Sequence, residues 1–204
     1  MDQTNHSITL YSAQTKYVHE LLIREGVVYS KASYVHQKYQ ESAKIFQTAY
    51  DWFVQYMADY VPKPSDAEYP YWAFTQPHSV DTSGDGVVLT LDVPLDEAVF
   101  FDMYDWLKIM RLQYIGETKT EEDIFRRQLT QYGIRHESDI LLTNFYPDLK
   151  RQIQDSWQRL FRHHEKIKSG DASDVGNVQA GMWQLRRDWL KDRTKTINTT
   201  DNSG

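Results

Sequence analysis

The segment from Ala49 to Phe74 constrains the fold more than any other part of this 204-residue chain. Its 26 residues hold two of the six tryptophans, five tyrosines, two phenylalanines and three of the six prolines. Each large aromatic side chain buries roughly 150–250 Å², so most of these rings must lie in a core or form the wall of a pocket. The pattern predicts a helix that ends at Pro62, because proline lacks an amide hydrogen, and then an aromatic strand. Such a platform suits a planar ligand and an ordinary core equally well.

The composition narrows the class of protein. A chain of this length fits one domain with a sizeable core, and its 14% aromatic content predicts a core rich in Trp, Tyr and Phe. The absence of cysteine excludes a disulfide framework, thiolate metal sites and a cysteine nucleophile. No apolar run approaches the ~18 residues of a membrane span, and the N-terminal residues lack the apolar core of a signal peptide. We therefore expect a cytoplasmic protein.

The charge is unevenly distributed along the chain. The net charge is −6, but residues 150–196 hold 11 Lys and Arg against 6 Asp and Glu, whereas residues 1–149 hold 12 against 22. The basic region 150–196 has two interpretations: solvated helix faces paired with the acidic body, or a surface for phosphates or an acidic protein partner. General nucleic-acid binding is disfavoured, because most of the molecule would repel the phosphate backbone.

The order of elements predicts a single α+β domain over residues 1–194, with a small, bent, mainly antiparallel sheet flanked by several helices. Residues 195–204 are expected to form a disordered tail. The loop Ser83–Gly86 has the residues of a tight turn. Period-two alternation and aromatic or β-branched content predict strands at 8–11, 69–74, 87–93 and 178–185, with shorter ones at 27–29 and 98–101.

Helices are expected where apolar residues recur every three or four positions. Asp102 and Asp105 resemble a capping box, as do Thr120 and Asp123, and Pro147 suits the first turn of a helix. The predicted helices cover 13–25, 35–60, 102–113, 120–133, 138–145 and 147–168.

Several common chemistries lack their sequence signatures. The chain has no phosphate-binding glycine loop, no GxGxxG, no GxSxG and no HExxH. His163 and His164 are adjacent on a predicted helix, so their side chains point about 100° apart and are poor co-ligands for a metal. Asp81 and Asp85 flank glycines as in a calcium loop, but the required downstream glutamate is absent and a hairpin turn accounts for them better.

Distinctive aromatic motifs occur across residues 8–190: LYSAQ from Leu10, AYDW from Ala49, YPYWA from Tyr69, LTLDVP from Leu89, Asp102–Trp106, SWQRLF from Ser156 and VQA from Val178. Together these motifs resemble a known bacterial family. That family is the domain of unknown function 3841. Because the family has no assigned function, the resemblance implies that the aromatic set belongs together and carries over no catalytic residues.

The order of elements also resembles ADP-ribosyltransferase-like domains. That resemblance implies an NAD site with Tyr11 and Gln14 after the first strand, Tyr71 and Trp72 after the proline break, and Gln179 in the catalytic position of the last strand. In that family the last position is a glutamate, whose charge stabilises the oxocarbenium-like transition state. A neutral amide keeps the hydrogen bond and loses the charge, which implies slow, rearranged or absent transferase chemistry.

Each candidate residue also has a structural interpretation. Trp52 and Trp106 on helix faces are expected in the core, and Trp72 fits either the core or a ligand contact. Gln179 lies in an otherwise apolar strand, where an amide without partners costs ~1–3 kcal/mol, so it is either a satisfied structural amide or a ligand contact. Two functions therefore stay open: a domain that binds NAD or a related nucleotide, and a non-enzymatic interaction module such as a bacterial or phage-borne inhibitor or regulator.

Overall fold

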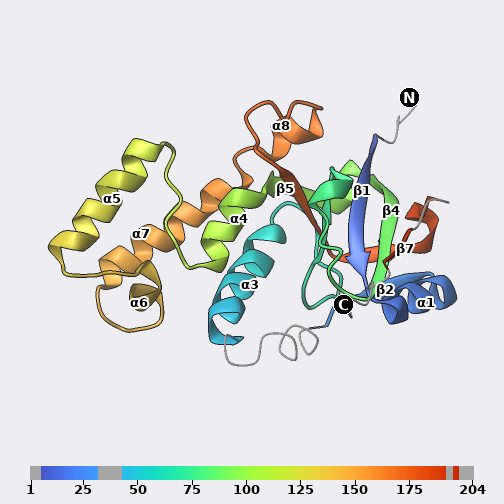
Figure 1. Cartoon of the computed structure of the whole chain (residues 1–204), viewed down its shortest axis with the longest axis horizontal. Helices are drawn as coiled ribbons and strands as arrows, with labels where there is room; N and C mark the ends of the chain where they lie inside the picture. The colour runs from blue at the N-terminus through green and yellow to red at the C-terminus, as the bar shows by residue number, and fades with distance from the viewer. Residues whose placement is uncertain (1–5, 32–42, 192–194, 198–204) are drawn as a thin grey trace, which may run out of the picture.

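A computed structural model describes residues 6–31, 43–191 and 195–197. The fold is the predicted α+β domain. Figure 1 shows the sheet and the first helix at one end of the molecule and a group of helices at the other end, with the helices 43–57 and 103–110 between them. The sheet end carries the predicted site residues, and the predicted basic region 150–196 runs from the helical end back into the sheet.

The main sheet has six strands in the order β5-β6-β3-β1-β4-β8, and every recorded pairing is antiparallel. This confirms the predicted antiparallel sheet and its four principal strands. The strand at 195–197 pairs with residues 86–88, so the structure differs there from the disordered tail predicted for 195–204, and residues 198–204 lie outside the described part. The strands are β1 Ser7–Gln14, β3 Tyr71–Phe74, β4 Gly86–Pro94, β5 Ala98–Asp102, β6 Val178–Met182 and β8 Lys195–Ile197.

A separate two-stranded ribbon pairs β2 (Val27–Tyr29) with β7 (Gln184–Arg186). The single strand predicted at 178–185 is thus two strands that belong to different sheets. They separate at Trp183, whose ring is buried and whose indole N–H donates to the carbonyl of Val61 at 2.8 Å. Burying that ring while satisfying its donor requires the chain to leave the main sheet at this point.

The helices follow the predicted pattern with shifted boundaries, except that the single helix predicted at 147–168 is three separate segments, Pro147–Trp157, Gln158–Phe161 and His164–Lys168. β1 continues through Gln14, so α1 begins after its N-cap Thr15 and ends at Gly26, which has the left-handed φ of 82° that favours glycine. The N-cap of α5 is Thr118, two residues before the predicted cap Thr120. Of the predicted helix 35–60, residues 35–42 lie outside the described residues. The α-helices are α1 Lys16–Glu25, α3 Ala43–Met57, α4 Met103–Met110, α5 Lys119–Gln131, α6 Glu137–Leu141, α7 Pro147–Trp157 and α8 His164–Lys168; the 3₁₀ turns are η2 Pro77–Ser79, η3 Leu95–Glu97, η4 Gln158–Phe161 and η5 Arg187–Trp189.

Each face of the main sheet packs against its own hydrophobic cluster. On β5, Val99 and Phe101 belong to the cluster that includes α3, α4 and α7, whereas Ala98 and Phe100 belong to the cluster that includes α1 and α8. This alternation follows from the period-two geometry of a strand. Trp52 and Trp106 are buried in the first cluster, as predicted.

The first prediction concerns His164 on α8, which is 3% exposed and accepts the backbone N–H of Phe100 through Nδ1 at 3.1 Å. Burial lowers the pKa of His164 from 6.5 to about 4, although Glu165 raises it and Lys168 lowers it further. Between pH 6.5 and about pH 4, His164 binds a proton in the unfolded chain but not in the folded chain. The free energy of unfolding should therefore fall as pH drops below about 6.5, by up to about 1.4 kcal/mol per pH unit, and level off near pH 4.

Urea unfolding at several pH values measures this dependence. In the His164→Gln variant that part of the pH dependence should disappear, whereas His136→Gln, at an exposed position, should retain it. An unchanged slope in His164→Gln would contradict the assignment.

Candidate functional site

Two of the predicted site residues, Gln14 and Trp72, line the same pocket, whose volume is about 460 Å³. It lies where the end of β1, strand β3 and the loop before β4 meet. Volumes of ~300–1,000 Å³ are usual for small-molecule pockets. The lining residues are Ala13, Gln14, Thr15, Trp72, Phe74, Val80, Asp81, Ser83, Gly84, Asp85 and Gly86.

The indole of Trp72 is held in place by other aromatic rings. Its Nε1 donates to the hydroxyl of Tyr50 at 3.1 Å. Its ring meets Tyr50 and Phe53 edge to face, with centroids 5.6 and 4.8 Å away, and Trp106 at a tilt with centroids 5.0 Å apart. Trp72 is nevertheless only partly buried. Its ring is therefore a rigid wall that requires no ordering when a ligand binds.

A chain of side-chain hydrogen bonds fixes Gln14 beside Trp72. Gln14 Nε2 donates to Ser12 Oγ at 2.8 Å, and Ser12 Oγ donates to the carbonyl of Trp72 at 2.6 Å. Ser12 is fully buried. Its hydroxyl satisfies the carbonyl of Trp72, which lies beyond the recorded β1–β3 pairing. Gly86 packs closely against Gln14 at the edge of the pocket. A Cβ at Gly86 would lie only 2.4 Å from the carbonyl oxygen of Gln14.

The structure separates the other predicted residues from this pair. Tyr71 precedes Trp72 on β3 and packs into the cluster on the opposite face of the sheet. Tyr11 pairs with Phe74, and Phe74 pairs with Gln179, so Tyr11 and Gln179 are on one face but separated by an intervening strand. Two strand spacings amount to about 9.6 Å. None of these three residues is among those that line the pocket.

Gln179 lies within the sheet rather than on a cleft wall. It is 5% exposed and sits between Phe74 on β3 and Phe101 on β5. Its Oε1 is buried without a hydrogen-bond partner, which is the unsatisfied state that costs ~1–3 kcal/mol. Gln179 is not among the residues that line the pocket of Gln14 and Trp72.

The charged residues of the pocket are both acidic. Asp81 Oδ1 accepts the backbone N–H of Ser83 at 2.9 Å, which forms an Asx turn, and Asp85 pairs with Lys16 at 2.8 Å. Among the described residues that line the pocket, none is lysine or arginine. The sequence predicted this loop only as a tight turn. The two aspartates beside glycine were the only sequence signal of a polar site in this loop. That Asp81 and Asp85 line a pocket becomes visible only where β1 and β3 meet the loop.

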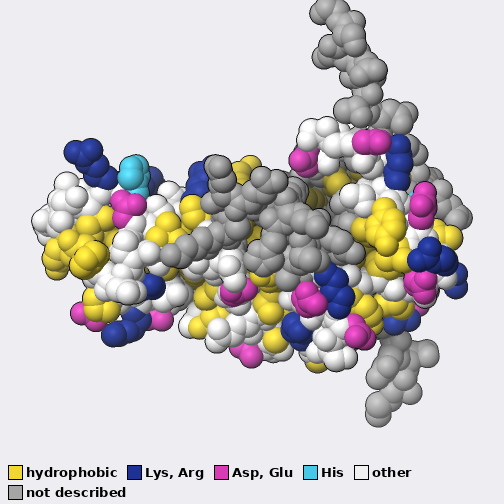
Figure 2. All heavy atoms as spheres, turned by 90° about the horizontal axis from the view of Figure 1, so that it is seen from below, with side chains coloured by type: hydrophobic (Ala, Val, Ile, Leu, Met, Phe, Trp, Pro, Cys, Tyr) yellow, Lys and Arg dark blue, Asp and Glu magenta, His cyan; other side chains and the backbone are white. Residues whose placement is uncertain are grey.

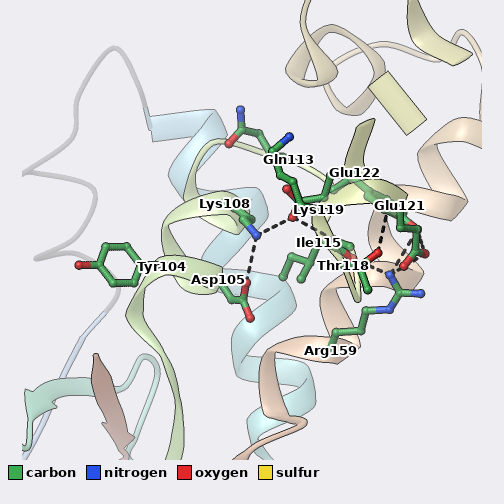
Figure 3. A network of polar contacts seen from close by, with 12 residues as sticks. Tyr104, Asp105, Lys108, Gln113, Ile115, Thr118, Lys119, Glu121, Glu122 and Arg159 are labelled. Carbon is green, nitrogen blue, oxygen red and sulfur yellow. Dashed lines mark hydrogen bonds and ion pairs between the residues drawn. The ribbon is translucent and has the colours of Figure 1, made fainter. Parts of the chain in front are cut away.

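A second polar site lies between α4, α5 and η4, and Figure 3 shows part of it. Asp105 is 4% exposed and contacts Arg162 at 2.7 Å and Lys108 at 3.2 Å. Lys108 also contacts Glu122 on α5 at 2.6 Å. Burial lowers the pKa of Lys108, but its bonds to Glu122 and Asp105 outweigh burial and raise that pKa overall. Each charge therefore has an opposite partner.

This network continues to Arg159, which fixes the turn between α4 and α5. Arg159 contacts Glu117 at 3.1 Å and Glu121 at 2.9 Å, and donates to the carbonyl of Ile115 at 2.7 Å. Arg159 therefore makes ion pairs within the chain. The arrangement joins the helical end of the molecule to α4 and has no reactive group left without a partner, so we assign it to stability rather than chemistry.

Many cations of the basic region 150–196 have acidic partners within the chain. Besides Arg159 and Arg162, Lys166 contacts Asp171 and Asp174, Arg186 contacts Asp188, and Lys191 contacts Asp92. This pattern favours the first interpretation of the region, in which helix faces pair with acidic residues. An acidic partner bound through residues 150–196 would have to displace these contacts.

The comparisons with known proteins place the chain in one family. The family model described as "Domain of unknown function (DUF3841)" matches residues 9–191, and the chain belongs to this family. No curated protein and no solved structure matches the chain. The comparisons thus give no support to the resemblance to ADP-ribosyltransferase-like domains.

The described residues hold neither a metal-ion cluster nor a membrane-spanning helix. Within residues 6–31, 43–191 and 195–197, no group of three His, Asp or Glu side chains is arranged to hold a metal ion. In the same part of the chain, no helix combines the length and hydrophobicity that crossing a membrane requires.

The second prediction compares two arginine ion pairs. Arg162→Gln leaves the buried Asp105 with Lys108 alone, and breaking a buried pair costs about 3–5 kcal/mol. We expect a loss near the lower figure in the free energy of unfolding, because Lys108 stays. The control is Arg151→Gln, whose pair with Asp148 is 3.5 Å long and exposed on both sides; such pairs contribute ~0–1 kcal/mol. Equal losses in urea unfolding would show that the buried network does not stabilise the fold.

The third prediction concerns Gln179. Replacing it with methionine, which has a similar shape, removes the unsatisfied Oε1 from the sheet. The free energy of unfolding should rise by ~1–3 kcal/mol, measured by urea unfolding. A decrease of similar size would mean that the amide is satisfied in solution, for example by a bound molecule.

Proposed function

We propose that this protein binds the planar ring of a nucleotide-type ligand, such as NAD or a related molecule, in the pocket of Gln14 and Trp72. The single observation that carries the proposal is that two residues 58 positions apart, chosen from the sequence as ligand contacts, line one pocket. Trp72 offers an immobilised ring, and Phe74 adds a second aromatic wall. Base–aromatic stacking contributes ~1–3 kcal/mol per base.

The polar groups of the pocket supply orientation. Gln14 lines the pocket and is held by Ser12 through its amide nitrogen. The loop from Val80 to Gly86 supplies most of the other lining residues, among them the polar Asp81, Ser83 and Asp85. A carboxamide or a nucleobase edge hydrogen-bonds to such groups, and a few placed polar groups in an aromatic pocket are typical of ligand sites.

The proposal covers binding and does not include a transferase step. Gln179, the residue in the proposed catalytic position, is neutral and buried away from the pocket. A neutral amide cannot supply the charge that stabilises an oxocarbenium-like transition state. Any reaction at this pocket would have to use Asp81 or Asp85, the acids that line it.

A second candidate function is protein interaction, and an exposed aromatic group favours it. Tyr132, Phe145 and Tyr146 are 56%, 73% and 42% exposed, and the rings of Tyr132 and Tyr146 lie 5.9 Å apart. Figure 2 shows hydrophobic side chains beside basic and histidine side chains at the helical end of the molecule. Exposed aromatic groups of this kind are common at protein interfaces.

The fourth prediction fills the pocket without altering the core. Ala13 is exposed and lines the pocket, whereas Ser7 is exposed at the far end of the same strand. Ala13→Tyr should abolish ligand-induced stabilisation because its ring occupies the ligand's place, and Ser7→Tyr should leave it intact. Melting temperature is measured with millimolar NAD, nicotinamide, ADP-ribose and ATP. A native-state ligand stabilises by RT ln(1 + [L]/Kd), ~2.7 kcal/mol at one hundred times Kd.

The outcomes separate the two candidate functions. A shift with one of these ligands that Ala13→Tyr removes supports the pocket. A shift that survives in Ala13→Tyr places the site elsewhere and contradicts the proposal. If no ligand raises the melting temperature, the interaction module is favoured. The Phe145→Ser variant should then lose binding to the partner protein.

A further inference from the structure

A second pocket, at the helical end of the molecule, is lined by three arginines. Its volume is about 650 Å³, and it shares no lining residue with the pocket of Gln14 and Trp72. It lies where the end of α4, the second half of α5 and the start of α6 meet. The arginines are Arg111, Arg126 and Arg135, and we call this site the arginine pocket. Arginines gathered in a concave site favour the binding of an anion.

The backbone brings these arginines together through two left-handed residues. After α4, Leu112 has a φ of 56°, which a leucine seldom adopts, and it directly follows Arg111. After α5, Gly133 has a φ of 71°. This second turn reverses the chain, so that Arg135 lines the same pocket as Arg126 of α5.

Two of the three arginines have no carboxylate partner within the described part of the chain. Arg111 and Arg135 are exposed, and their side chains take part in no ion pair or hydrogen bond with the described residues. Arg126, by contrast, pairs with Asp123 at 3.2 Å. A guanidinium group presents a planar fork of N–H donors that matches the oxygens of a phosphate. Arg111 and Arg135 are therefore the residues that we expect to hold an anion.

One acid, Glu137, lines the arginine pocket and must be weighed against these cations. Its Oε2 accepts the backbone N–H of Tyr114, so this carboxylate already holds a structural contact. Burial raises the pKa of Glu137, and the N–H of Tyr114 and the charge of Arg126 partly offset that rise. Even with Arg126 counted as neutralised by its own partner, Arg111 and Arg135 outnumber Glu137. The lining of the pocket therefore keeps a net positive charge.

Uncharged donors in the lining add to the arginines. Gln113 and Ser138 supply an amide and a hydroxyl, and neither side chain is hydrogen-bonded to another described residue. His136, which is exposed, adds an imidazole. A phosphate group has three strong acceptor oxygens and can accept from several such donors at once.

We propose that the arginine pocket binds a small ligand through a phosphate or diphosphate group held by Arg111 and Arg135. Its volume is in the range usual for small-molecule pockets, which leaves room for the body of the ligand as well. The site is additional to the proposed function and does not depend on it, because the two pockets share no residue.

Inorganic pyrophosphate, which has no ring, is the probe that tests this site. Isothermal titration calorimetry of the full chain at low ionic strength should show binding, and added salt should weaken it. Arg111→Gln and Arg135→Gln should each weaken binding about tenfold, because each removes a hydrogen bond between two charged groups. The matched control is Arg127→Gln, which removes the same charge from an exposed position on α5 outside the pocket and should bind as the unaltered chain does.

Two further measurements locate the site and its chemistry. Ala13→Tyr, which fills the pocket of Gln14 and Trp72, should leave pyrophosphate binding unchanged. Citrate, which carries several carboxylates, should bind more weakly than pyrophosphate. Circular dichroism of every variant checks that the fold is retained.

Four results would overturn the proposal. The first is no binding of pyrophosphate at millimolar concentration. The second is an equal loss in Arg127→Gln, which would show attraction by the overall charge rather than by the pocket. The third is a loss in Ala13→Tyr, which would place the anion in the other pocket. The fourth is tighter binding of citrate, which would show a carboxylate site.

Discussion

The packing of Phe53 on α3 holds the two halves of the molecule together. Its ring is fully buried and contacts the rings of Trp72 on β3, Phe101 on β5, Trp106 on α4 and Phe161 on η4. The contact with the sheet depends on Gly181, where a Cβ would lie 3.0 Å from the phenyl ring. A larger residue there would push the helix from the sheet. Because one ring joins four elements, its position decides where the covering helices sit.

The pocket adjoins this packing at Trp72, which is partly buried, and at Ala13, which is exposed. Trp72 contacts Phe53 and Trp106 on one side and lines the pocket on the other. Beyond it, Ala13 at the end of β1 stays exposed. The pocket therefore lies at the boundary between the covered and open parts of the sheet, where an aromatic side chain is both rigid and accessible. The charge network around Asp105 serves a different purpose and attaches the distal helices to α4.

The sequence predicts the elements well and their assembly incompletely. The alternation in β4 and the glycine at the end of α1 are local signals, and both elements form as expected. Trp72 lines the pocket and Tyr71 does not, because neighbours on a strand point to opposite faces of the sheet. Nothing in the local sequence indicates which of the two faces will be open. Burial of Gln179 likewise depends on strands that flank it from distant parts of the chain. The meeting of Gln14 with Trp72 requires β1 to lie beside β3, which is a non-local pairing.

The central claim is that a planar ring binds against Trp72, and a nuclear magnetic resonance titration tests it most directly. In ¹⁵N-labelled protein the indole N–H of each tryptophan and the side-chain amide of Gln14 give separate signals. Addition of nicotinamide should shift the signals of Trp72 and Gln14, and should leave that of Trp157, which is buried and bonded to Gln113, unchanged. Saturating shifts confined to tryptophans other than Trp72, or no shifts at millimolar ligand, would contradict the account.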